Sequence, residues 1–150
     1  MLRDHTGRRN DYGKLAGRFL FLLLYAALPA AASDVQVIAN WSVRVSTVSP
    51  ADLKSIFWET KTSLNDGSRV EPVLLKAGEV HETFVRQYTG KTPVSLAMYY
   101  RSLVFTGKGG MPKTFASEAE LVEYVKRTEG AIGYVSTQAN TDGVKILQVE

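Results

Sequence analysis

The residues best placed to bind a ligand lie in the segment 73–84, where a predicted strand passes through a short loop into a predicted helix. In open α/β sheets, ligands bind beyond the carboxyl ends of strands, and the free N–H groups of a helix N-terminus attract anions. The loop adds the cation of Lys76 and the flexible backbone of Gly78. The pattern permits a small-anion site, but every α/β protein has such loops, and an ordinary connecting loop with a surface lysine is the commoner case. The predicted ligand-binding residues are Lys76, Gly78, Val80, His81 and Thr83.

Other kinds of site have less support in the sequence. His81 is the only histidine after residue 32 and cysteine is absent, so no metal site is expected. Glu79, His81 and Glu82 could form an acid–base group, but acidic residues in a first helical turn are also typical of a solvated N-terminus. No Gly-x-Ser-x-Gly motif of a serine hydrolase occurs. We therefore expect no enzyme and no cofactor, and Lys108 in its glycine-rich loop is only a secondary ligand candidate.

The first 32 residues have the pattern of a secretory signal peptide. Arg8, Arg9, Lys14 and Arg18 precede a 14-residue apolar run, Phe19 to Ala32, which ends in Ala30-Ala31-Ala32. A membrane anchor is the alternative, but a spanning helix needs about 20 apolar residues. We expect cleavage near Ala32 and a periplasmic or secreted protein whose single domain is residues 33–150.

Charge is balanced once this segment is set aside. Residues 1–32 contain five Lys/Arg and two Asp/Glu, so thirteen basic and thirteen acidic residues remain of the 18 and 15 in the whole chain. A neutral total argues against a nucleic-acid partner. Without cysteine the domain has no disulfide, and its stability must come from its core.

The clearest local signal is the segment 117–135. Ser117 and Glu120 have the spacing of a capping box, an amphipathic helix follows, and Gly130 can end it in the left-handed conformation. The short apolar run 131–135 then predicts a buried strand. A capped helix that leads into a buried strand is half of an α/β unit.

The remaining elements repeat this alternation of strands and helices. Strands are expected over 35–39, 43–48, 69–75 and 144–149, and helices after Ser49, after Gly78 and around Leu96 to Leu103 with Ser95 as the cap. Pro72 suits an edge strand or the irregular start of a strand. The order predicts one α/β domain with a mixed, mostly parallel sheet flanked by helices.

Three of these segments, in this order, resemble the second lobe of phosphate ABC transporter substrate-binding proteins, which are periplasmic binding proteins of type II topology. The segments are Ser49-Pro50-Ala51-Asp52-Leu53-Lys54-Ser55-Ile56-Phe57, Asp66-Gly67-Ser68-Arg69-Val70-Glu71-Pro72-Val73 and Gly130-Ala131-Ile132-Gly133-Tyr134-Val135. The resemblance covers nearly all of residues 33–150. It implies a single binding-protein lobe, phosphate or another small anion as ligand, and ABC transporter membrane components or another periplasmic protein as partner.

The sequence also departs from the family pattern. The family's phosphate loop, an Arg, three residues and Ser-Gly-Thr, falls on residues 76–82, where Lys76 replaces the Arg, Val80 brings no hydroxyl and Glu82 places a carboxylate near the anion. The family's glycine after Ile-Phe is Glu59. The resemblance therefore implies weak anion binding at most, and the alternative is a ligand-free interaction module that docks onto a periplasmic or membrane partner.

Overall fold

The computed structural model describes residues 34–150, and all structural statements below concern this part of the chain. The predicted signal peptide and its cleavage site near Ala32 lie outside the described residues. Among the residues that are described, no helix is long and apolar enough to cross a membrane.

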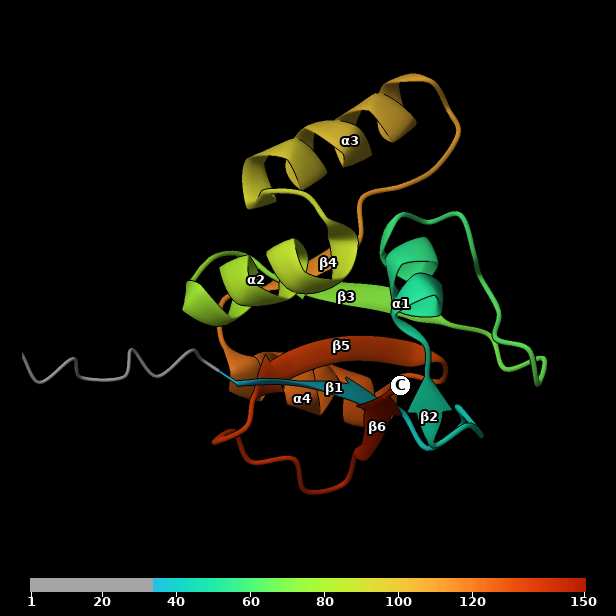
Figure 1. Ribbon diagram of the computed structural model, residues 1–150, viewed down its shortest axis with the longest axis vertical. Coiled ribbons are helices and arrows are strands. Elements are labelled where there is room, and N and C mark those ends of the chain that lie inside the picture. Colours follow the sequence, from blue (N-terminus) through green and yellow to red (C-terminus); the bar gives the residue numbers. More distant parts are fainter. Residues whose placement is uncertain (1–33) are drawn as a thin grey trace, which may run out of the picture. The chain divides into compact units, whose positions relative to one another are not determined.

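The described part is a six-stranded sheet with helices on both faces (Figure 1). The strands follow the order β2-β6-β1-β5-β3-β4 across the sheet. The strands are β1 (Val35–Ala39), β2 (Thr47–Val48), β3 (Glu71–Leu75), β4 (Lys113–Phe115), β5 (Ala131–Ser136) and β6 (Lys145–Val149). The helices are α1 (Pro50–Phe57), α2 (Glu79–Phe84), which continues as the π-helical turn η1 (Val85–Thr89), α3 (Pro93–Phe105) and α4 (Glu118–Arg127).

The sheet is mixed, with three parallel and two antiparallel pairs of strands. β3 runs parallel to both β4 and β5, and β2 runs parallel to β6. β1 is antiparallel to both of its neighbours, β5 and β6. The predicted mixed, mostly parallel α/β sheet is therefore confirmed.

Strand β5 lies at the centre of the packing, because its two faces contact different helices. Tyr134 stacks on Phe84 of α2 with ring centroids 3.8 Å apart, and Phe57 of α1 lies beside the same ring. Its neighbour Gly133 faces the opposite side, where a Cβ would lie 2.8 Å from Leu121 of α4 and 3.0 Å from Val73. Adjacent residues of a strand point to opposite faces, so α1 and α2 cover one face and α4 covers the other.

Local signals at the helix ends are confirmed. Ser49 accepts a hydrogen bond from the N–H of Asp52 at the start of α1, and Ser117 accepts one from Glu120 at the start of α4. The Glu120 carboxylate accepts in return from the N–H of Ala116, one residue earlier than an ideal capping box requires. Gly130 adopts a φ of 76° after α4, as predicted.

Several details differ from the sequence-based predictions. Of the strand expected over 43–48, only β2 (Thr47–Val48) forms. Strand β4 was not predicted, because three residues are too few to show a period. Helix α3 begins at Pro93 and its cap is Thr92, which accepts from the Ser95 N–H, so the prediction of Ser95 as cap is wrong. Pro72 lies in the interior strand β3, so the predicted alternative of an edge strand is wrong. It pairs only with β5, because the pairing with β4 begins one residue later at Val73. This matches the other predicted alternative, the irregular start of a strand.

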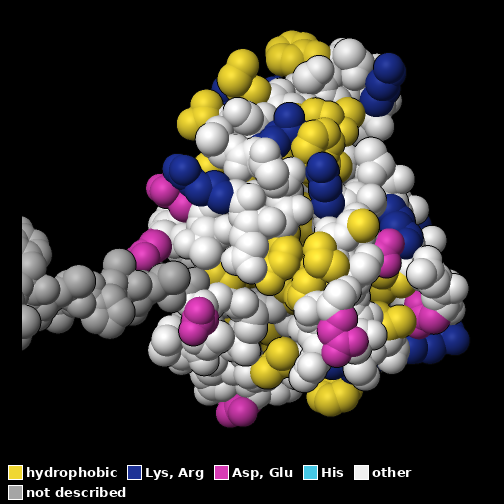
Figure 2. All heavy atoms as spheres, in the orientation of Figure 1, with side chains coloured by type: hydrophobic (Ala, Val, Ile, Leu, Met, Phe, Trp, Pro, Cys, Tyr) yellow, Lys and Arg dark blue, Asp and Glu magenta, His cyan; other side chains and the backbone are white. Residues whose placement is uncertain are grey.

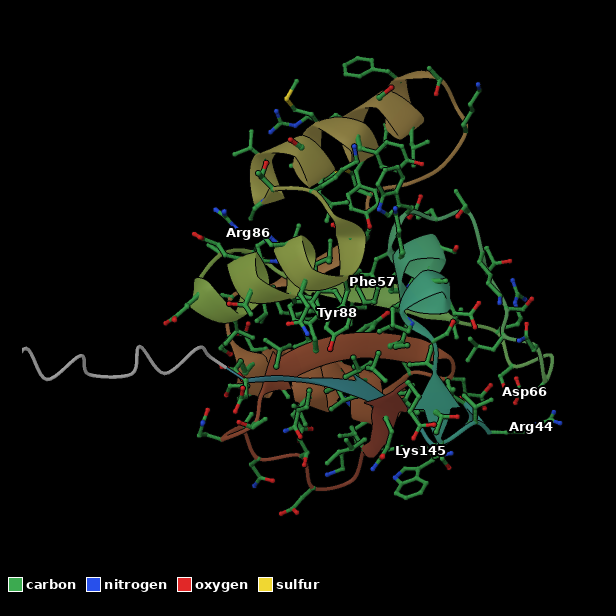
Figure 3. All side chains as sticks on the ribbon, in the orientation of Figure 1. Arg44, Phe57, Asp66, Arg86, Tyr88 and Lys145 are labelled. Atoms are coloured by element: carbon green, nitrogen blue, oxygen red, sulfur yellow. The ribbon has the colours of Figure 1, made fainter. Side chains whose placement is uncertain are left out.

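A continuous hydrophobic core joins the sheet to α1, α2 and α4. Its buried residues extend from Val37 to Leu147, and Phe57, Phe84 and Tyr134 form its aromatic centre. Figure 3 shows Phe57 and Tyr88 between the helices and the sheet. Because the core consists of described residues, we expect residues 33–150 to fold without the preceding segment.

Candidate functional site

The predicted anion site lies where β3 ends and the chain turns into α2. The backbone N–H of Lys76 donates to the carbonyl of Phe115 over 2.9 Å, so pairing with β4 fixes the end of the strand. Lys76, Ala77 and Gly78 are exposed, and Gly78 adopts a φ of 107° that lets the chain reverse into the helix. The sequence thus forms the strand–loop–helix corner that was predicted.

His81 points into the protein and not toward the exposed loop. Its Nδ1 lies 2.6 Å from the hydroxyl of Tyr134, and that hydroxyl also accepts the N–H of Leu75 over 3.2 Å. Burial lowers the pKa of His81, and the nearby Glu82 opposes this shift. The imidazole is therefore neutral at neutral pH and is a polar link between α2, β5 and β3.

A cavity of about 470 Å³ opens beside this corner, between the ends of β3 and β4 and helix α3. Lys76 and His81 both line it, whereas Gly78, Val80 and Thr83 do not. Val80 instead packs against the core. The rest of the lining is mainly apolar: Leu74, Leu75, Pro93, Val94, Leu96, Ala97, Tyr100, Met111 and Pro112, with Thr114 as a polar member.

The charges around the corner are mixed. Lys76 makes no ion pair with the described residues. Glu79 and Glu82 are exposed in the first turn of α2, and Glu82 lies 3.8 Å from Arg86, which points outward from η1 (Figure 3). An anion at Lys76 would meet one unopposed cation and two nearby carboxylates, so the corner favours weak binding in contact with water.

A second, larger cavity of about 820 Å³ lies near the start of β3, and no sequence signal predicted it. It collects basic and acidic side chains from segments far apart in the chain. These are Arg44, Lys61, Arg69 and Lys108 with Glu59, Glu71 and Glu129. Lys61 is held 2.5 Å from Asp52, and Arg44 and Asp66 lie in neighbouring loops (Figure 3). The secondary candidate Lys108 belongs here and not to the predicted corner.

Glu59, which lines this cavity, has an unusual backbone conformation. It has a φ of 54°, the only positive φ of a non-glycine residue among those described, and it occupies the position where the resembled family has glycine. Burial raises the pKa of its carboxyl, which accepts a hydrogen bond from the Gly110 N–H. The backbone at Glu59 thus has a left-handed shape that a glycine adopts without strain.

No group of three or more His, Cys, Asp or Glu side chains within residues 34–150 has the arrangement of a metal site. Two cavities of the described residues contain the candidate lysines, an apolar one lined by Lys76 and a polar one of mixed charge lined by Lys108.

Comparison with known proteins yields structural matches alone. No protein-family model and no curated protein matches the sequence. Among solved structures, an ABC-type phosphate transport receptor from Vibrio cholerae matches with a TM-score of 0.58 at 15% identity, over 77% of this chain and 46% of that chain. A protein assigned as a phosphate ABC transporter substrate-binding protein from Clostridium perfringens, with bound phosphate, matches with a TM-score of 0.59 at 16% identity, over 77% and 44%.

A third match, PstS from Borrelia burgdorferi, gives a TM-score of 0.52 at 12% identity, over 78% of this chain and 47% of that one. At such identities the likeness establishes the fold and not the ligand. The chain spans less than half the length of these proteins. The described residues therefore have the fold of one part of the phosphate ABC transporter substrate-binding proteins, as the motifs around Ser49, Asp66 and Gly130 indicated.

Proposed function

We propose that residues 33–150 form an exported, non-enzymatic solute-binding domain that binds phosphate or another small anion weakly beside Lys76. The observation that carries this proposal is the exposed Lys76 ammonium at the carboxyl end of β3, on the fold that the phosphate receptors share. Gly78 leaves the backbone of the loop accessible, since a Cβ there would meet nothing within 4 Å.

Weak affinity follows from the surroundings of Lys76. The loop is exposed, so a bound anion keeps much of its water, and the carboxylates of Glu79 and Glu82 oppose it. A lysine also offers a single point charge, whereas an arginine can bind an anion through two parallel hydrogen bonds. We expect a dissociation constant on the order of millimolar.

The test is calorimetric titration of residues 33–150 with phosphate, with sulfate as the competing anion. Binding should disappear in Lys76→Ala and persist in Lys54→Ala, which removes an exposed lysine from α1. Equal binding by both variants would mean that the anion binds away from Lys76. The absence of heat at millimolar phosphate would refute phosphate as the ligand. Export is tested separately by the N-terminus of the protein recovered from the periplasm, which should begin near Ser33.

A second candidate is the interaction module, which docks onto ABC transporter membrane components or another periplasmic protein. The apolar lining of the cavity beside Lys76 favours it, since a small inorganic anion makes no use of such walls. Retained folding with no response to phosphate in the titration would favour this candidate.

A further inference from the structure

Helix α3 is apolar around nearly its whole circumference but is covered on one side only. Its buried residues are Leu96 and Tyr100. Every residue advances an α-helix by about 100°, so Val94, Met98 and Phe105 fall in one stripe on the opposite side. These three side chains are 70%, 63% and 90% exposed. A helix with apolar residues on every side is normally buried on every side, so this stripe lacks a covering surface.

Two more exposed apolar side chains lie close to the stripe. Val104 lies on its flank, and Met111 in the loop before β4 lines a cavity with Val94 and is 53% exposed. Only two other large apolar side chains of the described residues are exposed, Trp41 and Ile146, and neither lies near α3 in the sequence. We call the set Val94, Met98, Val104, Phe105 and Met111 the α3 ridge.

The chain segment that carries the α3 ridge is basic, and the acidic Glu59 beside it accepts a hydrogen bond from the Gly110 N–H. Between Thr83 and Ser117 the chain has five basic residues and no acidic residue, although residues 34–150 as a whole have thirteen of each. Arg101 lies within the stripe of Val94, Met98 and Phe105, and Lys108 lies between Phe105 and Met111 in the sequence. Figure 2 shows hydrophobic and basic side chains over α3 at the top of the view, with the acidic ones below.

We propose that the α3 ridge docks on the surface of an anionic lipid bilayer. Amphipathic helices that lie at the bilayer interface insert Phe, Met and Val among the lipids while Lys and Arg contact the anionic head groups. Arg101 suits this role because a long basic side chain can lie along apolar surface and keep its charge at the head groups.

Other occupants of the ridge fit less well. A second copy of the chain placed ridge to ridge would bring Arg101 and Lys108 against the same charges. A protein partner needs an acidic groove shaped to a protruding helix, whereas a bilayer takes such a ridge without a preformed surface. Figure 1 shows α3 projecting beyond α2, away from the sheet. The proposal does not depend on phosphate binding, since Lys76 is outside the ridge.

The test is co-sedimentation of residues 33–150 with vesicles of phosphatidylcholine that contain phosphatidylglycerol, and with vesicles of phosphatidylcholine alone. We expect binding to the anionic vesicles only, and its loss at high salt. Phe105→Ser should weaken binding about tenfold and Arg101→Gln about fivefold. Both residues are exposed, so neither change should disturb folding, which thermal unfolding would verify.

Two matched variants separate the ridge from the rest of the surface. Trp41→Ser removes an exposed aromatic residue and Lys54→Gln removes an exposed charge elsewhere, and both should bind as the wild type does. In Phe105→Trp, a blue shift of the tryptophan emission on vesicle binding would report insertion. No sedimentation with phosphatidylglycerol, or binding that Phe105→Ser and Arg101→Gln leave unchanged, overturns the proposal. A dimer in solution that Phe105→Ser dissociates, with no vesicle binding, would overturn it in favour of a second copy.

Discussion

Replacing Tyr134 with phenylalanine tests the polar link inside the core. The ring would still stack on Phe84 and fill the same space, so the substitution removes one hydroxyl and creates almost no cavity. That hydroxyl accepts the Leu75 N–H over 3.2 Å and contacts His81 Nδ1 over 2.6 Å. Both of these contacts are buried.

The cost of the substitution follows from the two groups left without a partner. A buried donor or acceptor that loses its hydrogen bond costs about 1–3 kcal/mol. Two such groups, with some relaxation of the His81 ring, give a loss of about 3 kcal/mol in the free energy of unfolding. For a domain of this size we expect the melting temperature to fall by about 10 °C.

The measurement is urea unfolding of both proteins, followed by circular dichroism, with Tyr88→Phe as the matched control. Tyr88 also packs on Phe84, but its hydroxyl makes no hydrogen bond with the described residues, so that variant should change the free energy by less than about 0.5 kcal/mol. In a cycle with His81→Leu, the two changes together should cost less than their sum, since they share a contact. A Tyr134→Phe variant as stable as Tyr88→Phe would refute this account of the link.

Two further predictions concern the same region and the strand β5. The folded-state pKa of His81 lies below the ordinary value of 6.5, so the unfolded chain binds the proton first as the pH falls. The free energy of unfolding should therefore decrease below about pH 6.5 until the folded imidazole is itself protonated. The His81→Gln variant should lose this part of the pH dependence, and an identical dependence in both proteins would contradict the prediction. Gly130→Ala should destabilise the protein more than Gly107→Ala does. Both glycines have a positive φ, 76° and 65°, which costs an alanine about 1–2 kcal/mol. Only at Gly130 would the new Cβ also lie 2.7 Å from a backbone oxygen, that of Arg69. Melting temperatures of the two variants decide this, and equal losses would count against the steric argument.

Much of the fold could be predicted from the sequence because its signals are local. The side chains of Ser49 and Ser117 cap helices within their own first turns, and Gly130 ends α4 through its own φ. The apolar run of β5 reports burial on both faces directly. These features depend on residues a few positions apart, so reading the chain in order was enough to locate them. The sequence also determined the family resemblance, which the structural matches bear out for the fold.

The site depended on contacts that the sequence does not encode locally. His81 was expected to offer its N–H group at the loop, and its side chain turned out to be bonded to Tyr134, 53 residues away in the chain. The cavity near the start of β3 collects charges from five separate segments, none of which has a motif of its own. The strand β4 is defined by its pairing with β3 and not by any period.

Helix α3 shows most clearly what the sequence alone cannot predict. The spacing of Leu96, Tyr99, Tyr100 and Leu103 correctly predicted a buried face, but Val94, Met98 and Phe105 have helical spacing on the other side as well. Periodicity reports which residues share a face of a helix, and it does not report whether another element covers that face. Only the tertiary structure decided that one side of α3 packs against the protein and the other stays exposed, because burial depends on where distant segments are placed.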